Sequence, residues 1–386
     1  MGYAFTSADV AFLRSAAGIA ALAEVDALPF SDASRLRDVE VARKKLGPSF
    51  APVVETVLLR RRAVSKLDSA GSWLFADDAL QQATASAVAR HRALRFAGRD
   101  VHDVTCSVGA DLFALSAVAS RCLGSDLDLV RLAMARNNVP GQLVVQADAL
   151  RPVSKAGAVT ADPARRDSAG RRKWNPSDFV PPLDELSEVY SGVDLAVKCA
   201  PGIDFAVAPW AAEIEVVSLD GAVREACLWT RGLATPGVSR RASVLHGSDS
   251  WTLTDAEPDD CPVAPPGAWL IDPDGAVVRA GLVRHYAARH GLWQLDERIA
   301  YLSGDEPPPG IRAFRVLEHG HYTEKSLKSL LKTRGVGRLE ILVRGLDIDP
   351  NTLRKRLKLS GSASATVVLT RIGSRPVFVL SEAERT

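Results

Sequence analysis

The chain has 386 residues, 47% of them hydrophobic and 24% charged, and a formal net charge of +2 at pH 7. These ordinary globular values exclude disorder of the whole chain, and a chain of this size usually forms two or three domains of roughly 100 to 200 residues. No stretch reaches the about 18 uninterrupted apolar residues that a spanning helix needs, so we expect no membrane partner. The apolar start of the chain is interrupted by Asp9, Arg14 and Glu24. It therefore predicts a helix rather than a signal peptide.

The cysteines are spread widely along the chain, with no CxxC pair and no histidine at metal-binding spacing. This distribution indicates neither a disulfide framework nor a metal site, so we expect no metal and a cytoplasmic protein. The five cysteines are Cys106, Cys122, Cys199, Cys227 and Cys261.

Residues 1–96 carry helical periodicity almost throughout, which predicts an N-terminal helical domain. Over residues 97–246 short apolar strands alternate with helical stretches, and this pattern predicts an α/β domain with a mostly parallel sheet. Ligands of such sheets bind beyond the carboxyl ends of the strands. The strand-like segments are VHDVTC, CLGSDL, QLVVQAD, GAVTAD, DLAVKCA, AEIEVVSL and EACLWTR.

The last third of the chain has a different character. Residues 247–267 are rich in proline, glycine and aspartate and lack periodicity, so we predict a linker there. Residues 268–386 follow as a small α+β domain that ends in a predicted hairpin turning at Gly373 and Ser374. Between residues 311 and 376 the chain has fourteen Lys or Arg residues and five acids. This local excess of positive charge indicates a polyanionic partner such as RNA.

Acidic residues follow three successive strands of the predicted sheet. Asp103 ends the first strand, just before a turn that contains Gly109, while Asp126 ends the second strand and Asp148 the third. An acid at a strand tip can accept both ribose hydroxyls of an adenosine, and a turn of small residues lets backbone N–H groups approach a ligand. Each acid alone is more often a helix N-cap, but the ordered set predicts a donor site. A dinucleotide site is the competing interpretation, and it requires G-x-G-x-x-G, of which this turn has only Gly109.

The turn TCSVGADL resembles the C-G-V-G-G-N loop of class I methyltransferases, in the trimethylguanosine-synthase-like branch. The resemblance implies a Rossmann-like class I methyltransferase sheet and S-adenosylmethionine as the methyl donor, although Ser107 departs from the glycine of that family. The preceding helix resembles one that covers the donor, which implies contacts from Gln82 and Thr84, with helix capping as the alternative. The implied donor contacts are Asp103, Thr105, Cys106 and Gly109 around the methionine, Asp126 at the ribose and Asp148 at the adenine.

The fourth predicted strand ends in Asp162 and Pro163, where amino-methyltransferases carry D/N-P-P-aromatic. Methylation of an amine needs a side-chain acceptor and a backbone carbonyl on the two amine protons, and Asp162 with the Pro163 carbonyl can supply both. Arg165 replaces the aromatic residue, and its guanidinium can stack on a base. The alternative is a proline-terminated strand followed by solvated arginines.

A basic loop interleaved with aromatic residues comes next. Such a loop can track phosphates while it stacks a base, and a solvated loop pinned by the packing of its tryptophan is the alternative. The predicted substrate contacts are Arg166, Arg172, Lys173 and Trp174.

A rival chemistry rests on Cys199 at the end of the fifth predicted strand. The C5-pyrimidine methyltransferases use a thiol nucleophile within S-C-N-P, and Cys199-Ala-Pro201 matches that motif at only two of its four positions. A cysteine at the end of a central strand is usually just buried, so we expect Cys199 to be dispensable.

Residues 67–231 together with the basic tail resemble bacterial methyltransferases that carry a THUMP-like domain, and this resemblance implies a C-terminal domain that binds RNA. The predicted function is therefore transfer of a methyl group to a base nitrogen in structured RNA. The alternatives are a methyltransferase of a small molecule or a protein, and a binding module that keeps the donor fold without catalysis. No feature of the sequence predicts an oligomeric state.

Overall fold

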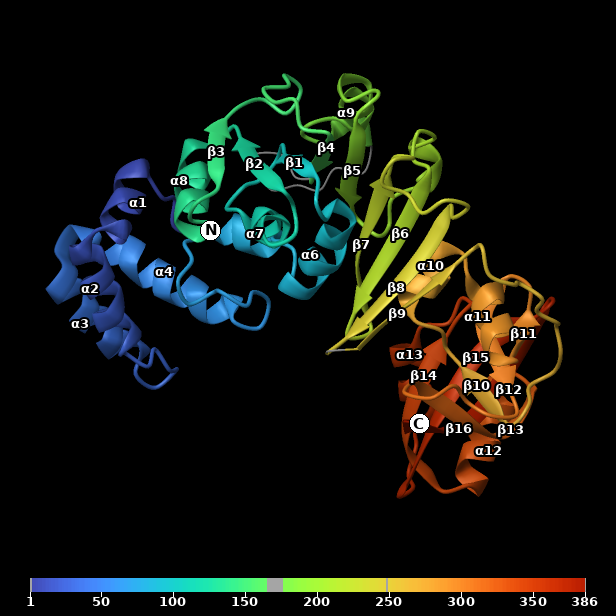
Figure 1. Cartoon of the computed structure of the whole chain (residues 1–386). Coiled ribbons are helices and arrows are strands. Elements are labelled where there is room, and N and C mark those ends of the chain that lie inside the picture. Colours follow the sequence, from blue (N-terminus) through green and yellow to red (C-terminus); the bar gives the residue numbers. More distant parts are fainter. Residues whose placement is uncertain (1, 165–175, 248, 386) are drawn as a thin grey trace. The chain divides into compact units, whose positions relative to one another are not determined.

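The structure is a computed structural model that describes residues 2–164, 176–247 and 249–385 (Figure 1). The chain divides into two compact units, of which the first comprises Met1–Leu219 and Arg224–Pro236 and the second Asp220–Val223 and Gly237–Thr386. The first unit combines helices with a largely parallel sheet, and the second contains a seven-stranded sheet with helices. The predicted fold class, a Rossmann-like sheet with a helical N-terminus and a C-terminal α+β part, is confirmed.

The first unit begins with helices, as the periodicity predicts. Thr6 starts the first of them with a capping box, in which its hydroxyl accepts from the Asp9 N–H while the Asp9 carboxylate accepts from the Thr6 N–H. The apolar faces of the first five of these helices form a core that also takes in Val108 and Met134. The helices are α1 (Ser7–Arg14), α2 (Ala16–Asp26), α3 (Arg35–Leu46), α4 (Phe50–Ala63), α5 (Asp77–Gln82) and α6 (Ser86–Ala93).

All seven predicted strands of the first unit are present, in the order β3-β2-β1-β4-β5-β7-β6. The first five run parallel, and β7 pairs antiparallel with β5. Because successive strands leave β1 in opposite directions along the sheet, the carboxyl ends of β1 and β4 flank a topological switch point, where ligands of such sheets bind. The strands are β1 (Asp100–Asp103), β2 (Arg121–Asp126), β3 (Leu143–Gln146), β4 (Ala158–Ala161), β5 (Asp194–Cys199), β6 (Glu213–Leu219) and β7 (Ala222–Trp229).

Helices α7 (Ala110–Ser116), α8 (Leu129–Asn138) and α9 (Leu183–Val189) connect the strands of this sheet. At the end of α8, the buried side chain of Asn138 joins segments that are far apart in the sequence. Its Oδ1 accepts from the Leu74 N–H at 2.8 Å, and its Nδ2 donates to the carbonyls of Leu74 and Val108, each at 2.9 Å. A fully hydrogen-bonded buried amide of this kind fixes the position of the backbone around it.

The second unit contains a hairpin of β8 (Arg240–His246) and β9 (Asp249–Thr254), followed by a sheet in the order β11-β12-β10-β13-β16-β15-β14. Strand β9 lies within residues 247–267, where we predict a linker. It forms because Leu253 is buried opposite Ala242 and Trp251 pairs with Val244 in the hairpin. The sheet strands are β10 (Trp269–Ile271), β11 (Trp293–Asp296), β12 (Ile299–Gly304), β13 (Arg312–His321), β14 (Val336–Val343), β15 (Ala363–Ile372) and β16 (Arg375–Arg385).

Two helices of this unit, α12 (Glu324–Thr333) and α13 (Pro350–Leu357), pack leucines onto β14, β15 and β16. Helices α10 (Gly275–Ala280) and α11 (Val283–His290) precede the sheet strands β11 and β12. The predicted hairpin at Gly373 is present, with Ile372 paired to Arg375 and a left-handed φ of 61° at the glycine. Within the described ranges, no helix is both long enough and apolar enough to cross a membrane.

Candidate functional site

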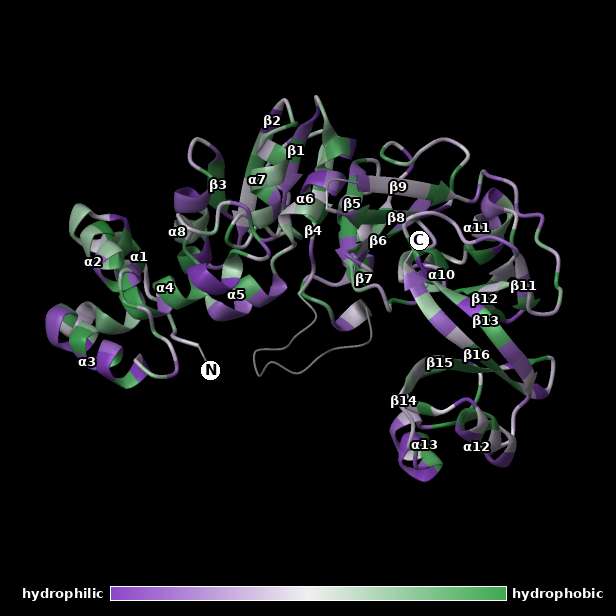
Figure 2. Ribbon diagram, turned by 90° about the horizontal axis from the view of Figure 1, so that it is seen from below, coloured by the Kyte–Doolittle hydropathy of each residue, from purple (hydrophilic) through white to green (hydrophobic). Residues whose placement is uncertain are grey.

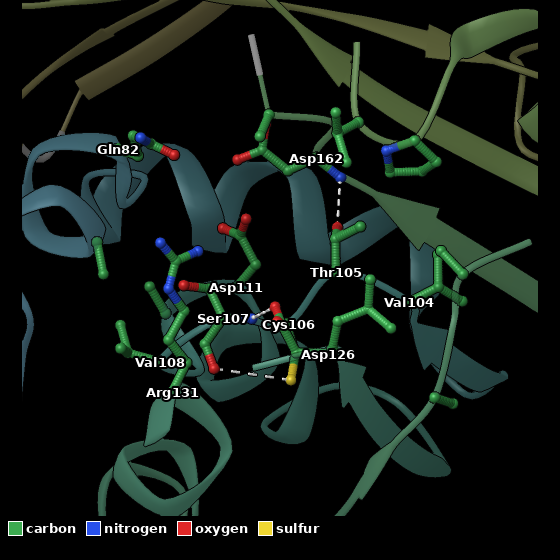
Figure 3. Close-up of a pocket in the computed structure, with 18 of the residues that line it drawn as sticks. Gln82, Val104, Thr105, Cys106, Ser107, Val108, Asp111, Asp126, Arg131 and Asp162 are labelled. Carbon is green, nitrogen blue, oxygen red and sulfur yellow. Dashed lines mark hydrogen bonds between the residues drawn. The ribbon is translucent and has the colours of Figure 1, made fainter. Parts of the chain in front are cut away.

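A cavity of about 400 Å³ lies at the carboxyl ends of β1, β2 and β4, at the switch point of the sheet (Figure 3). Its volume falls within the roughly 300 to 1,000 Å³ of small-molecule pockets. The lining combines apolar side chains such as Val104 and Leu127 with carboxylates, which suits a ligand with an apolar base and a polar ribose. The sequence-predicted residues that line the cavity are Gln82, Thr84, Thr105, Cys106, Asp126, Asp148 and Asp162.

The turn after β1 forms one wall of the cavity. The Cys106 N–H donates to the Ser125 carbonyl at 2.9 Å, and the Gly109 N–H donates to the Cys106 carbonyl at 2.8 Å. Ser107 adopts a left-handed φ of 48° and its N–H donates to Oδ2 of Asp126. A serine in the left-handed conformation therefore stands where the similar family has glycine, and a backbone hydrogen bond joins the turn to the tip of β2.

Two predicted donor residues lie behind this wall rather than on it. Asp103 is 3% exposed, and its Oδ1 accepts from the Thr105 N–H at 3.2 Å. Burial, with repulsion from Asp111, raises the pKa of Asp103 well above its usual value. Gly109 has a φ of 90°, and a Cβ there would stand 2.7 Å from Cγ2 of Val139. Both residues are absent from the lining, and their geometry supports a role in shaping the turn.

Cys106 lines the cavity, but it is buried and its thiol is not activated. Burial and the nearby carboxylates Asp103 and Asp126 raise the pKa of this thiol, so it stays neutral at physiological pH. Cys106 therefore serves as a small residue of the turn and not as a reactive thiol.

The segment around Gln82 and Thr84 covers the cavity from the side of α5. The Lys66 ammonium donates to the carbonyls of Leu80 and Gln81 at 2.9 and 3.0 Å, which satisfies the carboxyl end of the helix. Burial, with repulsion from Lys198, lowers the pKa of Lys66 to about 8.

Two charged lining residues were not predicted from the sequence. Asp111, in the first turn of α7, accepts from the Thr84 hydroxyl at 3.2 Å and pairs with the buried Arg92 at 2.6 Å. Burial raises the pKa of Asp111, but Arg92, Lys198 and the hydrogen bond from Thr84 together outweigh burial and lower this pKa. Arg131, from α8, carries the one positive charge among the described lining residues and pairs with Asp78 at 2.5 Å. A carboxylate and a guanidinium in one cavity lining, here Asp111 and Arg131, suit the zwitterionic end of an amino acid.

A signal for these two residues is weak in the sequence. Asp111 stands in the first turn of a helix, where an acid is ordinary because it complements the helix dipole. Arg131 falls within an amphipathic helical pattern, where a basic residue usually means a solvated face.

The acceptor motif follows β4. The Asp162 N–H donates to the Thr105 hydroxyl at 2.7 Å, and its carboxylate pairs with Lys198 on β5. Pro163 is buried and does not line the cavity, whereas Ala164 does. Ala164 pairs with Val180 through two backbone hydrogen bonds of 2.8 and 3.0 Å, and this pairing brings the 180–182 segment to the cavity. The predicted Arg165, Arg166, Arg172, Lys173 and Trp174 lie outside the described residues.

Cys199, the residue of the rival chemistry, is 5% exposed at the end of β5 and does not line the cavity. A nucleophile must reach the ring that it attacks. Its position therefore gives no support to C5 methylation. The described residues also contain no cluster of three or more His, Cys, Asp or Glu side chains that could hold a metal ion.

Comparison with known proteins shows which family the chain belongs to. A family model described as THUMP domain-like matches residues 311–383, and a domain of unknown function, DUF8688, matches residues 6–63. The chain is 53% identical over 345 residues to an uncharacterised S-adenosylmethionine-dependent methyltransferase of Mycobacterium tuberculosis strain CDC 1551, an alignment that covers 86% of this chain and 96% of the relative. A solved structure of a proposed methyltransferase from Porphyromonas gingivalis W83 has a similar fold, with a TM-score of 0.72, 22% identity, and coverage of 92% of this chain and 99% of that chain.

The sheet order and the cavity at its switch point define a class I methyltransferase, as the resemblance implies. The chain belongs to the S-adenosylmethionine-dependent methyltransferases and carries a THUMP-like domain at its C-terminus. S-adenosylmethionine is its methyl donor.

Proposed function

We propose that the protein transfers a methyl group from S-adenosylmethionine to a base nitrogen in structured RNA. The observation that carries this proposal is the common lining of one cavity: Asp162 from the acceptor motif lines it together with Asp126 and Asp148 from the donor strands. A donor and an acceptor bound there would be neighbours, as direct transfer requires.

The acceptor motif fits the chemistry of an amine. When bound, S-adenosylmethionine supplies a methyl group on a positively charged sulfur. The sulfur keeps the electron pair of the broken S–C bond and becomes a neutral thioether. The Asp162 carboxylate, which lines the cavity, accepts a hydrogen bond from a base N–H group, so that the nitrogen lone pair points at the methyl carbon. As the N–C bond forms, the nitrogen loses one proton to the Asp162 carboxylate, which passes it to water.

The THUMP-like part offers a surface for the RNA. Six of its fourteen basic residues between 311 and 376 form ion pairs with carboxylates, and these are Arg312, Arg315, Arg334, Arg344, Arg356 and Arg371. The other eight form no ion pair with a described residue. Unpaired surface cations are the groups that gain most from phosphate contacts, because they release counterions without breaking an existing pair.

Most of the unpaired cations belong to two neighbouring helices, α12 and α13, which Figure 2 shows with hydrophilic residues. Arg356 pairs with Glu324 at 3.3 Å and so joins the two helices. Helix α12 buries Leu327 and Leu331 and exposes the lysines on its other side. We call this surface the basic face, and it consists of Lys325, Lys328, Lys332, Arg354, Lys355 and Lys358.

The test is a reconstitution with RNA from cells that lack the gene. The purified protein is incubated with that RNA and S-adenosylmethionine, and the digested nucleosides are analysed by mass spectrometry. We expect a methylated base nitrogen to appear. Methyl groups on carbon 5 of a pyrimidine, or on proteins or metabolites instead of RNA, would replace this proposal, and absence of any transfer would favour a silent binding module.

A further inference from the structure

Asp162 has a buried cationic neighbour on the next strand. Strands β4 and β5 pair in parallel with Ala161 opposite Val197, so the residues that follow, Asp162 and Lys198, stand side by side. The Lys198 ammonium contacts Oδ2 of Asp162. The Lys198 side chain is 14% exposed and does not line the cavity, whereas that of Asp162 is 35% exposed and does. Among the described residues, the contact of Lys198 with the cavity wall is therefore its ion pair with Asp162.

The charge of Lys198 is held by its surroundings. Burial lowers the pKa of a lysine, but attraction to Asp162, and then to Asp111, outweighs burial here and raises the pKa of Lys198. Glu225 on β7 adds to this attraction, while Arg92 opposes it. Lys198 is therefore a charged ammonium throughout the physiological pH range, in contact with a carboxylate of the cavity wall.

We infer that Lys198 is a positioning residue for methyl transfer, which holds Oδ2 of Asp162 so that Oδ1 can accept hydrogen from the methyl acceptor. This inference rests on the proposed role of Asp162. Among the described residues Oδ1 has no partner, while the backbone of Asp162 is held by the Thr105 hydroxyl at 2.7 Å. Because the backbone and Oδ2 of Asp162 are held, the carboxylate presents Oδ1 to the methyl acceptor in one orientation. Methyl transfer depends on such alignment of the reacting groups.

The experiment measures methyl transfer from labelled S-adenosylmethionine into a desalted lysate of cells that lack the gene, with and without ribonuclease treatment. The variants are Lys198→Met, Lys198→Arg, Asp162→Asn and the double variant Asp162→Asn/Lys198→Met. The control is Lys155→Met, which removes an exposed lysine outside the cavity. Donor affinity is measured by calorimetry for each protein, and circular dichroism checks folding.

We expect Lys198→Met to slow transfer at least tenfold at saturating donor, with donor affinity within twofold of the wild type and the acidic limb of the rate–pH profile moved to higher pH. Lys198→Arg, which keeps the charge, should recover the rate to within threefold. If Lys198 acts through Asp162, the double variant should be at most threefold slower than Asp162→Asn, because the rate effects of coupled residues do not add.

A fully active Lys198→Met protein, or a double variant at least tenfold slower than Asp162→Asn, would overturn the inference. Should Lys198→Met not fold, Lys198→Gln keeps a hydrogen-bond donor without the charge and takes its place in the cycle. The ribonuclease arm is separate: transfer that survives ribonuclease refutes RNA as the acceptor, while the ratios between variants still decide the role of Lys198.

Discussion

The backbone N–H of Ser107 donates to Oδ2 of Asp126 at 2.9 Å, and the backbone N–H of Asp128 donates to Oδ1 of the same carboxylate at 2.9 Å. Both oxygens of Asp126 are thus oriented by the protein alone. An ionised carboxylate oxygen can accept more than one hydrogen bond, so each keeps capacity for a hydroxyl of the donor ribose. The site is organised in advance of binding, which limits the entropy that binding costs.

Replacing Asp126 by alanine should weaken donor binding. Loss of charge-assisted hydrogen bonds typically costs about 1.5 to 3 kcal/mol, or roughly ten- to a hundredfold in affinity. Isothermal calorimetry with S-adenosylmethionine measures this change, and Asp184→Ala, at an exposed position on α9, is the control. Equal affinity of Asp126→Ala and wild type would remove Asp126 from the donor site.

The basic face should govern RNA affinity. Replacing Lys325, Lys328 and Lys332 by glutamine should weaken RNA binding and reduce the dependence of log affinity on log salt by about one for each phosphate that the variant no longer binds. Fluorescence anisotropy with labelled RNA at several salt concentrations measures both effects. The control replaces Lys44 and Lys45 on α3, and donor affinity should stay unchanged in both proteins. An unaltered salt dependence in the triple variant would make the basic face an ordinary solvated surface.

Substitutions at Asp162 and Cys199 separate the two acceptor chemistries. Asp162→Ala should reduce turnover by about a hundredfold or more while donor affinity stays nearly the same, because the amine loses its proton acceptor. Cys199→Ala should remain active, because this thiol does not reach the cavity. Rates of methyl transfer and trapping with 5-fluoropyrimidine RNA provide the readouts. A folded but inactive Cys199→Ala protein, or a covalent RNA adduct, would establish the thiol chemistry instead.

His102 should make the stability of the first unit depend on pH. Its ring is 2% exposed and hydrogen-bonds to Ser125 and Ser154 at 2.9 and 3.0 Å, and burial lowers its pKa from 6.5 to about 4. Between these two values the unfolded chain binds more protons than the folded one, so the free energy of unfolding falls as pH decreases from about 6.5 to about 4. Urea denaturation across this window should show a smaller decline for His102→Gln than for wild type. Parallel curves for the two proteins would contradict this account.

The strands, and the gathering of several acids at one cavity, could be expected from the sequence because parallel strands end at one edge of a sheet. Asp126, Asp148 and Asp162 stand far apart in the chain, yet each follows a strand of one sheet, so their common cavity could be expected. The hairpin at Gly373 could be expected in the same way, from two apolar runs around a turn. Strand β9 could not, since its short DSWTLT run is surrounded by turn-forming residues and becomes a strand only through its pairing with β8.

The sequence does not show which charged side chains form ion pairs. Lys198 is 36 positions from Asp162, and only the pairing of β4 with β5 brings them together. Arg131 belongs to an ordinary amphipathic helix, and its place at the cavity depends on how α8 packs. In the tail, the count of basic residues overstates the available charge, because partners such as Glu340 and Glu382 neutralise some of them through cross-strand pairs. These facts belong to tertiary structure.

The side-chain amide of Asn138 connects the turn after β1 to the N-terminal helices. Through its bonds to Leu74 and Val108, and through the core that Val108 shares with Val10 and Val53, the turn after β1 and the first helices have a common set of contacts. Residues that open together exchange their amide hydrogens together. Occupation of the donor site should therefore slow hydrogen exchange in α1 and α4, so that these remote helices report whether the donor is bound.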